Sequence, residues 1–214
     1  MKNGRVSSEE AHPYHHGDLR RALVDAAMAM VREEQDWTFS LREVARRAGV
    51  SHNAPYNHFA DKRDLLAAVA GAGFVALQER LQTSIAGIRS AETALIRSGV
   101  AYVKFGVENP AHYRLMFGSV FVGDDKGRPQ LLVDVEGRAK GVLAGIIQWG
   151  AQAGVFHVSP TSRKELDIAV LSAWSVVHGL TMLAIDGQVG PPPLKIDKIA
   201  EKLARTFSYG IVRR

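Results

Sequence analysis

Apolar residues recur every three or four positions along most of the chain, which is the period of an amphipathic helix. Residues 18–31 carry such a stripe and predict a first helix. The Ser-x-x-Glu sequence at 40–43 is a capping box that opens a short second helix, and Gly49 ends it. Ser51 is expected to cap a third short helix ending near residue 59, and Asp61 a longer one that runs to residue 81.

The same period continues toward the C-terminus, and no alternating pattern is long enough to predict a strand. Pro110 opens one short helix, and a second capping box at 162–165 opens a long one. The helices expected after residue 81 lie at 95–107, 110–116, 130–151, 162–185 and 196–207. Together the patterns predict an all-α fold of about nine helices.

Residues 168–185 contain no Asp, Glu, Lys or Arg and reach the lower limit of ~18 residues for a membrane-spanning helix. Ser172, Ser175 and His178 interrupt its apolar character, and a charged amphipathic segment follows it. We therefore interpret it as a helix buried inside an all-α protein. Residues 1–13 are polar and lack the apolar core of a secretory signal, so we expect a cytoplasmic protein with no membrane partner.

The composition of the 214 residues fits this interpretation. Hydrophobic residues make up 46% and charged residues 23%, values that exclude a wholly disordered or fibrous chain. At this length an apolar core holds without covalent cross-links. The absence of cysteine excludes disulfide scaffolds, thiolate zinc sites and cysteine nucleophiles, and it agrees with a reducing compartment.

Residues 41–59 have the order of a helix-turn-helix: a short helix, a turn that contains Gly49, and a second helix whose start is polar. In that motif the second helix enters the DNA major groove, and flanking residues hold phosphates. Hydroxyl, imidazole and amide groups of the second helix can bond to base edges or phosphates. They belong to Ser51, His52, Asn53 and Asn57, whereas Tyr56 and Lys62 suit phosphates.

The net charge of +5 points to DNA only where it is local. Residues 1–64 hold ten Lys and Arg against ten Asp and Glu, a difference of zero, so the surplus lies in residues 65–214. Within residues 41–63, however, five basic residues face only Glu43 and Asp61, which leaves +3. The basic residues are Arg42, Arg46, Arg47, Lys62 and Arg63. This balance predicts a small set of phosphate contacts rather than general adhesion to nucleic acid.

Three segments of this region resemble the N-terminal domain of the TetR/AcrR family of bacterial transcription regulators. They are Tyr-His-His-Gly-Asp-Leu at 14–19, residues 40–51 and residues 55–66. Further along, Tyr-Arg-Leu-Met-Phe at 113–117 and Trp-Ser-Val-Val-His-Gly at 174–179 resemble the branch whose ligand domain carries a Trp-His-Gly signature. The resemblance thus reaches most of the chain.

The resemblance implies a non-enzymatic homodimer, without a cofactor, that binds a palindromic operator in double-stranded DNA. Such a protein is usually a repressor, and a small-molecule effector releases it. The chain then divides into an N-terminal arm and helix-turn-helix domain at 1–60 and a C-terminal ligand-binding and dimerisation domain at 61–214. The implied DNA-binding residues are Ser40, Arg42, Ser51, His52, Asn53, Tyr56, Asn57, His58 and Lys62.

Two positions depart from the family pattern. Gln35 and Asp36 replace the usual glycine after the first helix, so this turn must find another geometry. Asn57 stands where related sequences often have arginine, so their operators are a poor guide to this one. In addition, Pro55 lacks an N–H and crowds the preceding turn, which predicts a distorted start of the recognition helix.

Bulky residues of the C-terminal domain are candidates for a ligand pocket, although most are expected in the core. They are Tyr102, Phe105, Met116, Phe117, Trp149, Trp174 and His178. His178 is either the polar group of that pocket or a buried histidine satisfied by a carbonyl. A stripe of small residues and the apolar face of the last helix predict a four-helix dimer interface or packing within one subunit. These residues are Ser172, Ser175, Gly179, Ile196, Ala200, Leu203 and Phe207.

Two other functions are compatible with the sequence. A helical enzyme could pair His178 with Asp186 or Asp167, although no Gly-x-Ser-x-Gly, phosphate-loop or His-Glu-x-x-His sequence is present. A helical adaptor could bind protein through the same region, because the helix-turn-helix shape is not exclusive to DNA. The three histidines within residues 12–16 lack a carboxylate or cysteine shell, and we predict no metal site there.

Overall fold

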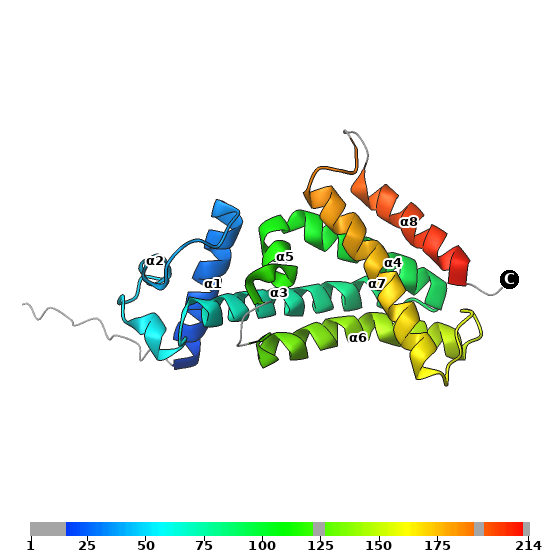
Figure 1. Ribbon diagram of the computed structural model, residues 1–214, viewed down its shortest axis with the longest axis horizontal. Coiled ribbons are helices and arrows are strands. Elements are labelled where there is room, and N and C mark those ends of the chain that lie inside the picture. The colour runs from blue at the N-terminus through cyan, green and yellow to red at the C-terminus, as the bar shows by residue number, and fades with distance from the viewer. Residues whose placement is uncertain (1–15, 122–126, 191–194, 212–214) are drawn as a thin grey trace, which may run out of the picture.

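The computed structural model describes residues 16–121, 127–190 and 195–211. The predicted all-α fold is confirmed within these ranges, with eight α-helices and two 3-10 turns (Figure 1). The helices are α1 (His16–Glu34), α2 (Leu41–Arg47), α3 (Lys62–Ile85), α4 (Ala91–Glu108), α5 (Pro110–Phe117), α6 (Gln130–Gln152), α7 (Arg163–Ile185) and α8 (Ile196–Ile211). The turns are η1 (Ala54–Asn57) and η2 (Ser119–Phe121). The α-helix count is one lower than predicted because residues 51–59 hold η1 in place of a third helix.

Polar caps start α2 and α3 where the sequence predicts them. Ser40 Oγ accepts a bond from the Glu43 N–H at 3.3 Å, and the Glu43 carboxylate accepts one from the Ser40 N–H at 2.7 Å, which completes the capping box. Asp61 Oδ1 accepts a bond from the Asp64 N–H at 2.9 Å and caps α3. These bonds fix the entry of both helices that flank η1.

The turn after α1 differs from our expectation. Gln35 has a φ of 58°, so it adopts the left-handed conformation that glycine usually supplies. Its side-chain amide donates to the Arg32 carbonyl at 2.7 Å, and Asp36 Oδ1 accepts a bond from the Thr38 N–H at 2.9 Å. The turn therefore keeps the geometry of the glycine and holds it with side-chain bonds, instead of finding another geometry.

The distortion predicted from Pro55 is confirmed, and it extends through the whole element. Residues 54–57 form a 3-10 turn whose N-cap is Asn53, and the Asn53 side chain makes no capping bond. Ser51 is thus not the cap that we predicted, although its carbonyl accepts a bond from the Ala54 N–H at 2.9 Å. Because Pro55 provides no N–H, the first α-helical bond of a helix capped by Ser51, from residue 55 to residue 51, cannot form.

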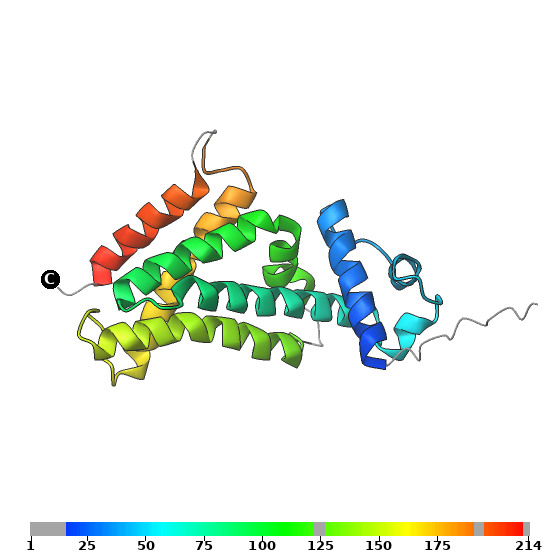
Figure 2. The ribbon, with the colours of Figure 1, turned by 180° about the vertical axis from the view of Figure 1, so that it is seen from behind.

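The helices form an elongated molecule with a small N-terminal group at one end (Figures 1 and 2). α1, α2 and η1 make up this group, and α3 runs from it beside α4 and α6. The largest buried cluster includes Val31 and Phe59 on one side of residue 61 and Leu65 and Phe74 on the other. The core is therefore continuous across the boundary at 60 and 61, and that boundary stays a prediction.

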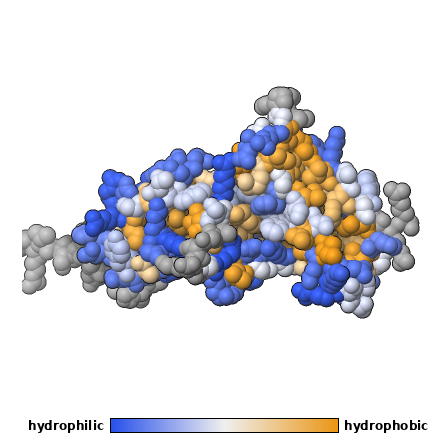
Figure 3. All heavy atoms as spheres, viewed as in Figure 1, coloured by the Kyte–Doolittle hydropathy of each residue, from blue (hydrophilic) through white to orange (hydrophobic). Residues whose placement is uncertain are grey.

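Helix α7 is far less buried than we predicted. Of its residues only Ala169, Ala173, Leu180 and Thr181 are buried. Ile168 and Leu171 expose 54% and 56% of their surface, and the apolar surface along this helix is visible in Figure 3. By length and composition α7 is the one helix of the described ranges that could cross a membrane, and only 22% of its most apolar window is buried. One subunit alone thus leaves much of this helix uncovered.

Candidate nucleic-acid interface and C-terminal cavity

The segment around η1 presents a row of polar side chains to solvent. The exposed residues of this row are Ser51, His52, Asn53, Tyr56 and Asn57. Pro55 and Phe59 are buried and fasten the segment to the domain, while His58 is half-buried. The short element therefore separates its apolar side from a polar side able to hydrogen-bond to an external partner.

The basic residues of α2 differ in how far their charges are already compensated. Arg42 and Arg46 are exposed, whereas Arg47 is paired with Glu33 of α1. Ser40 lies at the start of the same helix, and its hydroxyl accepts a backbone bond while keeping its own O–H as a donor. Helix α2 thus offers a hydroxyl donor and the Arg42 guanidinium at its start and the Arg46 guanidinium in its last turn.

Lys62 is the first residue of α3 and is half-buried. Its Nζ lies 5.5 Å from the centroid of the Phe39 ring. Burial lowers the pKa of Lys62, and the nearby carboxylates of Asp36 and Glu43 act in the opposite direction. Because the helix dipole disfavours a cation at an N-terminus, this placement suits an ammonium that meets an external anion.

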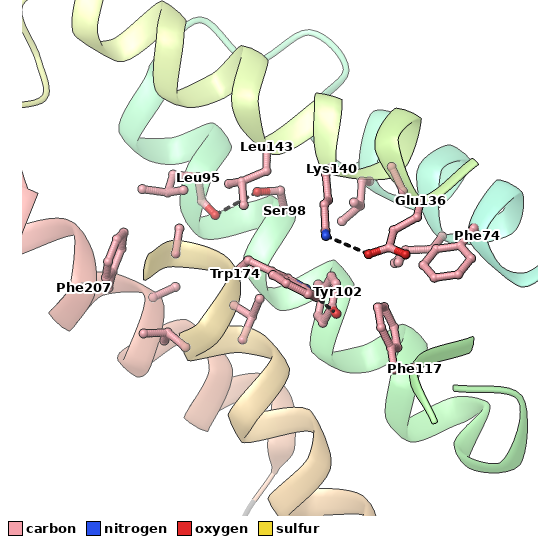
Figure 4. Close-up of a pocket in the computed structure, with 18 residues that line it drawn as sticks. Phe74, Leu95, Ser98, Tyr102, Phe117, Glu136, Lys140, Leu143, Trp174 and Phe207 are labelled. Atoms are coloured by element: carbon pink, nitrogen blue, oxygen red, sulfur yellow. Dashed lines mark hydrogen bonds and ion pairs between the residues drawn. The ribbon is translucent and has the colours of Figure 1, made fainter. Parts of the chain in front are cut away.

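A cavity of about 700 Å³, counted out to its mouth, lies among α3, α4, α5, α6, α7 and α8 (Figure 4). Its wall is largely apolar and includes Phe74, Leu77, Leu95 and Leu143. Three of the candidate pocket residues also line it, namely Tyr102, Phe117 and Trp174. The four aliphatic and aromatic residues named first escaped sequence reasoning, because their helical spacing does not distinguish a cavity wall from a core.

The other four candidates for the pocket lie off this wall. Met116 is fully buried in the main core, where its side chain packs against Gly73, and Phe105 is buried in the same core. Trp149 packs against the second buried cluster, which lies around Phe156. His178 stands behind the wall in a polar cluster. Tertiary packing therefore places Met116 and Phe105 in the core, whereas Trp149 and His178 are partly buried.

The candidate interface residues fall into two groups. Ser172 and Ser175 are exposed on α7, and a Cβ added at Gly179 would meet nothing within 4 Å, so this stripe lies uncovered. The residues of α8 instead pack within the subunit. Ile196, Ala200 and Leu203 join a small cluster with Val103 of α4, and Phe207 lines the cavity. Ile196, Leu203 and Phe207 remain partly exposed, so the role of α8 in a dimer interface stays a prediction.

The polar cluster behind the wall consists of Tyr102, Tyr113, Trp174 and His178. Trp174 Nε1 donates to Tyr102 Oη at 2.9 Å, and Tyr113 Oη lies 2.8 Å from Tyr102 Oη. His178 Nδ1 lies 2.7 Å from Tyr113 Oη and 3.2 Å from Tyr102 Oη. Burial, with a smaller contribution from the Lys140 ammonium, lowers the pKa of His178. His178 is therefore neutral at pH 7, and its Nδ1 lies within hydrogen-bond distance of two phenols.

This arrangement also overturns the hypothesis of a histidine enzyme. Asp186 is paired with Arg114, and Asp167 is paired with Arg163 at 2.9 Å, so both carboxylates have partners other than His178. A general base of this type needs a group that orients it and a reachable substrate proton. In the described part of the chain, no three His, Asp or Glu side chains are grouped to hold a metal ion.

A chain of three charged side chains lies along one edge of the cavity. Glu136 Oε2 is 2.8 Å from Arg128 Nη2, and Glu136 Oε1 is 2.7 Å from Lys140 Nζ. The Lys140 ammonium also lies 4.1 Å from the centroid of the Trp174 ring. Glu136 and Lys140 line the cavity (Figure 4). Sequence reasoning missed this group, because a Glu–Lys pair four residues apart is ordinary on an exposed helix face.

Helix α5 connects the cavity with the N-terminal group. Phe117 near its end lines the cavity, and the helix packs against α1 and α3. His112 is buried, its Nε2 donates to the Val69 carbonyl of α3 at 2.8 Å, and burial lowers its pKa. At Gly73 of α3 an added Cβ would lie 2.6 Å from Met116 Sδ, so only glycine allows α5 to seat so closely.

Two family models match this chain. The model "Bacterial regulatory proteins, tetR family" matches residues 23–69, and the model "Tetracyclin repressor-like, C-terminal domain" matches residues 95–207. The second match spans more than half of the chain. The Trp-His-Gly branch stays a prediction.

Solved structures with the same fold agree. The structure of a protein with unknown function from Rhodococcus sp. RHA1 is 29% identical with a TM-score of 0.78, and the match covers 95% of this chain and 100% of that one. A TetR family transcription regulator from Marinobacter aquaeolei VT8 is 19% identical with a TM-score of 0.64, covering 92% and 96%. The chain belongs to the tetR family of bacterial regulatory proteins and is a non-enzymatic, DNA-binding transcriptional regulator.

Proposed function

We propose that the protein is a homodimeric, cytoplasmic repressor that binds a palindromic operator and releases it when a small-molecule effector enters the C-terminal cavity. The observation that carries the proposal is the pairing of two sites in one chain. An exposed polar row lies at the N-terminal end, a largely apolar cavity lies in the C-terminal part, and α3 begins shortly after the row and lines the cavity.

The uncovered face of α7 supports the homodimer. Ile168, Leu171 and Leu183 expose about half of their surface, and Ser172 and Ser175 lie exposed near them. Small side chains allow a second helix to approach closely, and the apolar residues then lose their contact with water. A second copy is the natural occupant, because the most common soluble assembly is a two-fold dimer in which one face meets itself. This use of α7 also explains its apolar character without a membrane.

The polar row supports direct reading of the operator. Ser51, His52, Asn53 and Asn57 carry the groups that meet base edges in the major groove. Tyr56 of the row, together with Ser40, Arg42 and Lys62 outside it, suits phosphates, and phosphate contacts position the domain without reading sequence. We assign the half-buried His58 to the support of the row. Two copies then read half-sites one helical turn, or a multiple of it, apart.

The effector acts through a shift between two populations of the dimer. It must bind the operator-competent and the released arrangement with unequal affinity, because equal affinity shifts nothing. α5 offers a direct route, since Phe117 lines the cavity and His112 bonds to Val69 of α3 near the N-terminal group. A molecule that displaces Phe117 therefore moves α5. Through the bond of His112 to Val69 it also acts on α3, which leads to the DNA-binding residues.

The test uses fluorescence anisotropy with DNA from the region flanking the coding sequence. Specific, salt-sensitive binding of a dimer, with a symmetric footprint, supports the proposal. Light scattering of the free protein gives the oligomeric state independently. A monomer at micromolar concentration, or the absence of specific binding at low salt, would refute the proposal and favour the protein adaptor.

A further inference from the structure

The polar groups of the cavity wall are almost all occupied by the protein itself. Ser98 Oγ donates to the Leu95 carbonyl at 3.0 Å within its own helix. Tyr102 Oη already has Trp174, Tyr113 and His178 as partners. A phenol has one donor and two acceptor positions, so Tyr102 has no position left for a ligand. The polar contact of a bound molecule must therefore be made elsewhere on the wall.

The charges along the edge of the cavity do not cancel. Each oxygen of Glu136 already meets one cation, Lys140 at 2.7 Å and Arg128 at 2.8 Å. Two cations against one carboxylate leave this group with one positive charge. Glu136 and Lys140 are the charged side chains on the described cavity wall, and the surplus comes from Arg128, which contacts Glu136 from outside that wall and leaves Lys140 only partly compensated.

Lys140 is the member of the group that can accept a new partner. An ammonium has three N–H donors, and one of them is used by Glu136. The same ammonium lies over the face of Trp174, whose indole ring attracts a cation but leaves N–H donors for an oxygen acceptor. Glu136 side-chain exposure is 16% and that of Lys140 is 39%, so an anion at this point is only partly screened by water.

We infer that the effector is an apolar monocarboxylic acid whose carboxylate binds Lys140 and whose hydrocarbon part lies between Leu77, Leu95, Leu143 and Phe207. This inference rests on the proposed function. One carboxylate neutralises the surplus charge, whereas a cation would increase it and a dianion would exceed it.

The experiment compares three probes by titration calorimetry, each built on a linear ten-carbon chain: decanoate, decanol and decyltrimethylammonium. We expect one decanoate per chain, bound roughly 10- to 100-fold more tightly than decanol, as a charge-assisted hydrogen bond provides. The ammonium probe should bind most weakly. Equal affinity for decanoate and decanol, or tighter binding of the ammonium probe, overturns the inference.

Variants locate the carboxylate. Lys140→Gln should remove the preference for decanoate over decanol, and Glu136→Gln, which raises the local charge, should increase it. Arg138→Gln is the matched control, because it removes a positive charge from an exposed position of the same helix and should leave the preference unchanged. A preference that survives Lys140→Gln, or a stoichiometry above one that all variants share, counts against the site.

Operator binding is measured on the same preparations. Specific DNA binding without a preference for decanoate overturns the effector class and leaves the regulator intact. A preference for decanoate without specific DNA binding overturns the proposed function and leaves the carboxylate site standing. If Lys140→Gln fails to fold, the opposite effect expected of Glu136→Gln still decides, since loss of preference in that variant overturns the inference.

Discussion

Helices α4 and α7 cross at Gly106, and adding one methyl group there should destabilise the protein. A Cβ at Gly106 would lie 2.2 Å from Thr181 Cγ2 and 3.0 Å from Tyr113 Cδ2. Carbon atoms pack best at about 3.5–4.0 Å, so the helices must separate by more than 1 Å or Thr181 must change rotamer. Thr181 is fully buried and its hydroxyl donates to the Val177 carbonyl at 2.7 Å, so neither change is easy.

The magnitude follows from two opposing effects. Alanine is better than glycine inside a helix by about 1 kcal/mol, which favours Gly106→Ala. Overpacking costs about 3 kcal/mol at the upper end of its usual range, which applies to an overlap of this size. The net result should be a loss of about 2 kcal/mol in the free energy of unfolding, or roughly 4–8 °C in Tm for a chain of this size.

The assay is urea unfolding at one fixed protein concentration, because the stability of the proposed dimer would depend on concentration. Gly141→Ala is the control, since an added Cβ on this residue of α6 would meet nothing within 4 Å and should stabilise by up to about 1 kcal/mol. Thr181→Ser removes the clashing methyl and keeps the hydroxyl, so Gly106→Ala should cost less in that background. The reasoning is wrong if both alanines stabilise equally, or if the cost is the same with serine at 181.

Three further predictions concern DNA, the dimer and pH. Lys62→Ala should weaken binding to all DNA sequences alike and lower the salt slope by about 1, whereas Asn53→Ala should change the ranking of sequences in competition assays. Leu171→Glu should shift the dimer toward monomer in light scattering, while the same change at the exposed Arg138 should not. Burial lowers the pKa of His112, so the unfolded chain binds more protons, and stability should fall as pH drops below the ordinary value of about 6.5. Urea unfolding at several pH values should show a smaller fall for His112→Gln; an identical pH profile would contradict this assignment.

Local signals predicted the helices well because capping is a short-range effect. Ser40 and Asp61 place the starts of α2 and α3 through bonds to residues three positions away. The same logic identified the distortion at Pro55 but placed the cap at Ser51, since a missing N–H does not reveal which turn replaces the helix. The left-handed conformation of Gln35 was not predicted, because bonds within the turn stabilise its unfavourable φ. One of them is the bond from the Gln35 side chain to Arg32.

In the C-terminal part, tertiary contacts decide what the sequence pattern could not predict. The bulky residues were found, but Phe117 and Trp174 line the cavity while the neighbour of Phe117, Met116, packs in the core. The pair of Glu136 and Lys140 reads as a surface pair until Trp174 of another helix is seen beneath the ammonium. Which side of a helix meets a neighbour is decided by the other helices, and periodicity alone does not carry that information.

Helix α3 is one unbroken helix that links the cavity to the DNA-binding end of the chain. Its 24 residues extend about 36 Å, with the ammonium of Lys62 at one end and cavity residues such as Leu77 toward the other. A small tilt of α3 at the cavity displaces its other end by an amount that grows with the length of the helix. The DNA-binding residues can therefore move even where packing at the cavity is undisturbed. Operator half-sites repeat only every 34–36 Å or so. In the proposed dimer, a tilt of α3 in each subunit can therefore move the two DNA-binding groups out of register with the half-sites while the core stays intact.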